Sequence, residues 1–148
     1  MFSGFKGAAA TYAELDVETR VAAADSHNLI EMLFDGAIVA VGQADQCLVA
    51  GDIPGKGRAV SRAIRIVEEG LRASLNLDAG GDLARHMDDL YEYMSHRLLM
   101  SSIKNESEGF NEVRKLLAEL RQAWVQIRVP NKFTAATVGS VTSLATAA

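Results

Sequence analysis

Two rows of histidine and acidic side chains have a spacing that could hold a metal ion. His27, Glu31 and Asp35 recur at four-residue steps, and a second row follows later in the chain, at His86, Asp89, Glu92 and His96. Residues four apart share one face of a helix, so each row could present several ligands together. Di-iron bundles, however, combine helix-borne glutamates with two Glu-x-x-His pairs, and that combination is absent. We interpret both rows as solvated faces and predict no metal and no other cofactor, with a metal-dependent bundle enzyme as the alternative.

Two further features could in principle support catalysis. Cys47 would need a nearby base and a positive setting to act as a nucleophile, but its sequence neighbours are Ala44, Leu48 and Val49. Gly55-Lys-Gly-Arg58 follows no predicted strand and lacks the second half of a phosphate-binding loop. We therefore expect a protein that is not an enzyme.

Composition favours a single helical domain. The chain has 148 residues, 49% of them hydrophobic and only 6% aromatic, with two prolines and a formal charge of −4. This acidic balance gives no electrostatic attraction for nucleic acid. One cysteine and no secretory signal favour the cytoplasm, and no stretch approaches the roughly 20 uninterrupted apolar residues of a membrane span.

Hydrophobic periodicity predicts an all-α fold, an antiparallel up-down four-helix bundle. Residues 1–24 are expected to form an N-terminal arm, residues 25–128 the bundle, and residues 129–148 a disordered tail rich in Ala, Thr and Ser. The first helix should begin near Asp25-Ser26 and end before Gly51. The remaining three helices are expected at about residues 58–75, 82–104 and 107–127, joined by short connections.

Some positions within the helices invite a specific interpretation. Gly36 and Gly70 lie inside helices, where glycine costs stability, so we expect another backbone to approach each closely. Tyr91 and Tyr93 are two residues apart and should point to different sides of one helix. Trp124 is expected to close one end of the bundle.

The first predicted helix carries more apolar side chains than one buried stripe requires. They wrap well beyond the stripe of a surface helix: Leu29, Ile30, Met32, Leu33, Phe34, Ala37, Ile38, Val39, Ala40, Val41, Ala44, Cys47, Leu48 and Val49. Either this helix is the most central one of the bundle, or one flank forms a groove for a partner's amphipathic helix. The N-terminal arm, with Tyr12, Leu15, Val17 and Val21, is a candidate to cover such a groove.

An ordered set of motifs runs along the chain: Tyr12–Val17, Leu29-Ile-Glu-Met-Leu-Phe-Asp-Gly-Ala37, Ile53-Pro-Gly-Lys-Gly57, Ala63–Val67, Asn76–Leu83, Leu90-Tyr-Glu-Tyr-Met94 and Leu117–Trp124. This set, and not any one motif in it, resembles the FliS family, the cytosolic export chaperones of bacterial flagellin. The resemblance implies a chaperone that holds the disordered C-terminal segment of flagellin, prevents premature polymerisation and assists delivery to the flagellar type III export apparatus.

The resemblance also implies which residues contact the client. They form the groove and the arm that covers it: Tyr12, Val17, Leu33, Ala37, Ile38, Leu90, Tyr91 and Met94. The implied partners are the flagellin C-terminal segment and the flagellar export gate, without nucleic acid or membrane insertion. We expect a monomer or weak homodimer, and a homodimeric helical adaptor is the alternative function.

Overall fold

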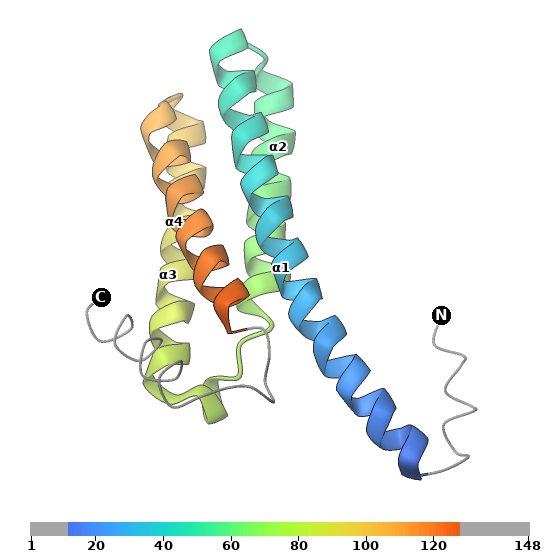
Figure 1. Ribbon diagram of the computed structural model, residues 1–148. Coiled ribbons are helices and arrows are strands. Elements are labelled where there is room, and N and C mark those ends of the chain that lie inside the picture. Colours follow the sequence, from blue (N-terminus) through green and yellow to red (C-terminus); the bar gives the residue numbers. More distant parts are fainter. Residues whose placement is uncertain (1–11, 128–148) are drawn as a thin grey trace.

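Four helices joined by short turns run alternately up and down to form a bundle (Figure 1). The computed structural model describes residues 12–127, with side chains from residue 25 onward. Its helices are α1 (Tyr12–Ala50), α2 (Ile53–Arg65), α3 (Leu77–Lys104) and α4 (Ser107–Gln126), and α2 continues directly into a π-helix, η2 (Ile66–Arg72). The all-α four-helix fold is confirmed, whereas the predicted tail at 129–148 lies outside the described residues.

The predicted start of the first helix is wrong. α1 begins at Tyr12 and passes through Asp25-Ser26 without a break. The segment from Tyr12 to residue 24 contains no Gly or Pro and includes four Ala and two Glu, which favour helix even without a clear apolar stripe. In Figure 1 this first part of α1, in dark blue, continues the helix axis beyond the other helices.

The second helix begins earlier than its glycines suggested. Asp52 caps it by accepting a hydrogen bond from the Gly55 backbone N–H at 3.0 Å, and Pro54 occupies the first turn, where its missing N–H costs nothing. The buried Lys56 then donates to the Ser102 carbonyl at 2.7 Å and to the side chain of Asn105. This lysine ties the α1–α2 turn to the end of α3.

The predicted start of the third helix at residue 82 is wrong, because α3 begins at Leu77 and continues through a kink at Gly81. Asn76 caps α3 by accepting from the Ala79 N–H, and Gly81 then leaves helical geometry at φ 60° and ψ −139°. A positive φ of this kind is accessible mainly to glycine. The helix ends, as predicted, at Asn105, which adopts the left-handed conformation at φ 55°.

The core is formed by small and medium apolar side chains from all four helices. Its largest fully buried members include Phe110, Leu71, Met94, Leu98 and Leu117. Gly109 lets α4 approach α3 closely, because a Cβ there would lie 1.7 Å from Ser101 Oγ.

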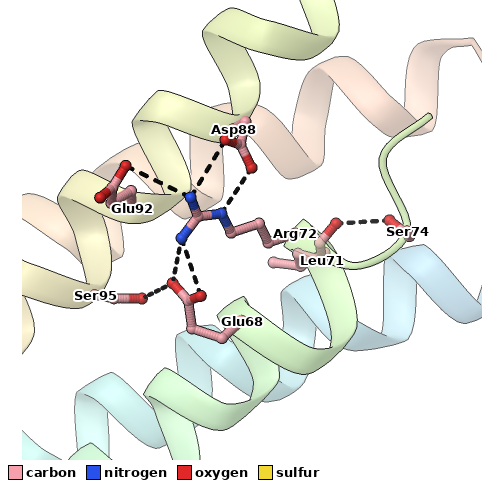
Figure 2. A network of polar contacts seen from close by, with 7 residues as sticks. All are labelled: Glu68, Leu71, Arg72, Ser74, Asp88, Glu92 and Ser95. Atoms are coloured by element: carbon pink, nitrogen blue, oxygen red, sulfur yellow. Dashed lines mark hydrogen bonds and ion pairs between the residues drawn. The ribbon is translucent and has the colours of Figure 1, made fainter. Parts of the chain in front are cut away.

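Polar contacts fasten η2 and α4 to α3. Arg72 bridges Asp88 at 2.7 Å and Glu68 at 3.1 Å, and it lowers the pKa of the Asp88 carboxyl through that contact (Figure 2). On the other side of α3, Arg97 donates to Glu112 at 2.7 Å, as does the Tyr93 hydroxyl. These two donors lower the pKa of Glu112.

One helical stretch of α1 is long and apolar enough to be compared with a membrane span. Asp25–Ala50 is a 26-residue helical stretch with a hydropathy of 1.2, so by length and composition alone it would suffice to cross a bilayer. In the bundle this stretch packs against α2 and α4. Its apolarity therefore also suits a helix that is covered on two sides.

Candidate docking groove

Large apolar side chains remain exposed along one face of α1. Leu29, Met32 and Val39 are 55%, 65% and 57% exposed. They lie at positions i, i+3 and i+10, and Gly36 occupies the i+7 position between them, so all four share one side of the helix. The central position of α1 in the bundle therefore does not account for all of its apolar residues.

Gly36 and Val39 of this strip line a groove between α1 and the α2–η2 helix, and Leu29 and Met32 continue the strip along α1. The groove has a volume of about 620 Å³, and its lining is mostly apolar. α1 contributes Asp35, Gly36, Val39, Ala40 and Gln43, and the opposite wall consists of Arg62 and Ile66. A mostly apolar groove with a few polar groups at its edge is typical of a site for an amphipathic helix.

The opposite flank of α1 is closed by α4. His27 stacks on Trp124 with ring centroids 4.4 Å apart and an interplanar angle of 12°. The indole N–H of Trp124 donates to the His27 carbonyl at 2.9 Å, and His27 Nε2 lies 3.0 Å from the Trp124 carbonyl. Arg121 also pairs with Glu31 at 3.2 Å and with Asp35. α4 thus covers one flank of α1, α2 and η2 pack on the other, and the groove lies at the surface where α1 meets α2–η2.

The predicted contact residues do not gather in one groove. Ala37, Tyr91 and Met94 are buried in the core, and Leu33, Ile38 and Leu90 are half-buried against it. Leu33 packs on Gly70 of η2, on the flank that α2 and η2 cover. Ile38 lies two turns after Glu31 and so faces α4, while Leu90, Tyr91 and Met94 belong to α3.

The tyrosines and Gly70 can be compared with what the sequence predicted for them. Tyr12 opens α1 and Val17 follows in it, but their side chains lie outside the described residues. The opposed orientations of Tyr91 and Tyr93 are confirmed. The close approach to Gly70 comes from a Leu33 side-chain atom, 3.0 Å from the position of a Cβ, and not from a backbone.

The candidate metal row on α1 has other partners. His27 is engaged by Trp124, and Glu31 and Asp35 pair with Arg121. Among the side chains of residues 25–127, no group of three or more His, Cys, Asp or Glu is placed to hold a metal ion. Cys47 is half-buried next to Gly55.

The apolar pattern of the sequence does not distinguish the residues at the groove from the other apolar residues of α1. Leu29, Met32 and Val39 appeared only as part of an apolar surplus, and Ile66 only as part of a motif. Their angular position was the available signal. They lie on the side of α1 away from the row through Ala37, which is fully buried.

The fold and the groove together define a class: a small all-α bundle that presents an apolar surface suited to a partner segment. Comparison with known sequences narrows this class. The chain matches the model of the family "Flagellar protein FliS" over residues 8–131 and belongs to that family.

Curated relatives agree with this assignment. The flagellar secretion chaperone FliS of Salmonella typhimurium is 44% identical over 116 residues, which cover 78% of this chain and 86% of the relative. The chaperone of the same name from Vibrio cholerae is 32% identical over 90% of this chain and 98% of the relative, and that from Escherichia coli is 37% identical over 76% and 83%. The chain is therefore a member of a family of flagellar secretion chaperones.

Proposed function

We propose that this protein binds the disordered C-terminal segment of flagellin in the cytoplasm, keeps it from polymerising prematurely and assists its delivery to the flagellar type III export apparatus. The observation that carries this proposal is the exposed apolar strip beside the groove between α1 and the α2–η2 helix. The role requires neither catalysis nor a cofactor. The family membership supports a flagellar client.

The groove suits a client that is disordered when free. Such a segment loses conformational entropy when it becomes ordered, so its affinity must come from burying apolar area. Leu29, Met32 and Val39 offer that area on a helix that α4 holds firmly in place. A client helix with apolar residues at i, i+3 and i+7 would lie along this strip.

In this proposal the N-terminal arm covers the groove until the client arrives. Because α1 is continuous from Tyr12, residues 12–24 would have to bend back over the groove near Asp25-Ser26. Both of these residues are exposed, and either can cap a new helix end. Sedimentation of the chain with and without residues 1–20 tests this step, since a chain without its cover should self-associate more strongly.

Size-exclusion chromatography with purified flagellin tests the proposed function. The expected result is a complex of about one to one that is lost when the C-terminal segment of flagellin is deleted. A truncated flagellin that binds as well as the intact one would refute the proposal. A stable homodimer that forms through the strip and does not bind flagellin would instead support a dimeric adaptor.

A further inference from the structure

The outer face of α2 carries three arginines that pair with no acidic side chain among the described residues. The helix contains no Asp or Glu, and Arg58, Arg62 and Arg65 are all exposed. None of the three forms an ion pair with a residue in the described part of the chain. Four other arginines do form such pairs, namely Arg72, Arg85, Arg97 and Arg121. The protein as a whole has a net charge of −4, so these three arginines form a local positive region on an acidic molecule.

These arginines lie at the edge of the groove. Arg62 forms part of the groove wall, where it donates to Gln43 of α1 at 3.1 Å, a neutral partner that orients the guanidinium without cancelling its charge. Arg62 also lines a second hollow of about 630 Å³ over α2, together with Arg58 and Arg65. The two hollows therefore adjoin at Arg62.

The surface between these arginines leaves room for a bound chain. The second hollow is also lined by Pro54, Gly57 and Ser61, which are small or compact. No atom lies within 4 Å of the position that a Cβ of Gly57 would occupy. A segment seated in the groove can thus bring its edge against α2 without meeting a large side chain.

We propose that Arg58, Arg62 and Arg65 form an arginine rim that selects and orients the client by binding acidic residues along one edge of the segment in the groove. This inference rests on the proposed function and specifies its client: an amphipathic segment with one apolar face and one acidic edge. Guanidinium groups bind carboxylates with two parallel hydrogen bonds, which adds direction to the attraction. The rim also steers an acidic client toward a protein that would otherwise repel it.

The test compares two triple variants of the full chain by calorimetry with intact flagellin. Arg58→Gln/Arg62→Gln/Arg65→Gln removes the rim, and glutamine keeps a similar helix propensity. The control, Lys104→Gln/Arg114→Gln/Lys115→Gln, removes the same number of positive charges from α3 and α4. We expect the rim variant to weaken binding by roughly tenfold at low salt, and less at high salt, because exposed ion pairs are screened. The control variant should bind nearly as the original does.

A second measurement uses a synthetic peptide of the flagellin C-terminal segment. Replacing its Asp and Glu by Asn and Gln should weaken binding to the original chain but leave binding to the rim variant unchanged. Equal binding of both triple variants, or a loss that salt does not reduce, would overturn the rim while leaving the proposed function intact. If the original chain fails to bind flagellin at all, the proposed function fails and the rim proposal fails with it.

Discussion

Replacing two exposed side chains of the strip should separate binding from folding. In the double variant Met32→Gln/Val39→Gln, the altered side chains are 65% and 57% exposed in the free protein, so stability should change by less than about 0.5 kcal/mol for each. Complete burial of such a side chain stabilises a complex by about 1.5–3 kcal/mol. The exposed fractions reduce this contribution to about 1–2 kcal/mol each, so the pair should weaken client binding by roughly 30- to 700-fold.

Calorimetry with flagellin measures the binding loss, and urea unfolding of the free chain measures stability. The matched control is Leu99→Gln/Ile103→Gln on α3, where the side chains are 47% and 64% exposed but lie away from the groove. We expect a much smaller binding loss for this control. Equal losses for both pairs would refute the assignment of the main site to the groove.

A substitution at Ala37, one of the implied contact residues, tests folding and not client binding. Its side chain is fully buried in the core, so Ala37→Glu places a charge in the interior and is expected to unfold the bundle. Loss of flagellin binding in that variant would report folding and not contact. Thermal unfolding of the Ala37→Glu chain checks this expectation.

Other perturbations test how the bundle is held together. Gly109→Ala should cost about 1–3 kcal/mol in urea unfolding, because its Cβ would overlap Ser101 Oγ. Ser101→Ala alone should be nearly neutral, since that hydroxyl has no hydrogen-bond partner among the described residues. Trp124→Phe removes the indole N–H bond to α1 and should cost about 1 kcal/mol in the same assay. Lys56→Met removes two donated hydrogen bonds of a buried ammonium group, and we expect it to lower the melting temperature measurably. The pKa of Glu112 is lowered in the folded protein. Its contribution to stability is therefore present above the ordinary glutamate pKa of about 4.3 and is lost as the pH falls through the lower folded value. In acid unfolding, the Glu112→Gln variant should lose less stability over that pH range than the original chain does.

Helix existence could be predicted from the sequence more reliably than helix starts. Periodic apolar residues predicted all four helices, and Gly51, Gly81 and Asn105 marked real ends or breaks. The starts of α1, α2 and α3 were missed because helix propensity and capping outweighed the weak apolar pattern at Tyr12, the glycines after Asp52 and the glycines before Asp82. The π-helix η2 has no signature in the apolar spacing, since it depends on how the chain packs between α1 and α3.

The site was only partly predictable, because polar side chains and a glycine, and not the apolar pattern alone, decide which helices pack on each side of α1. A surplus of apolar residues indicated that some surface of α1 needed a partner. The position of the groove depends instead on His27 and Arg121, which hold α4 against one flank of α1, and on Gly36, which lines the groove where α1 meets α2–η2. These contacts join residues far apart in the sequence, so periodicity along one helix cannot reveal them. The same pairing leaves Arg62 facing the groove without a carboxylate partner among the described residues. The proposed specificity of the groove therefore depends on charge, whereas its affinity depends on apolar area.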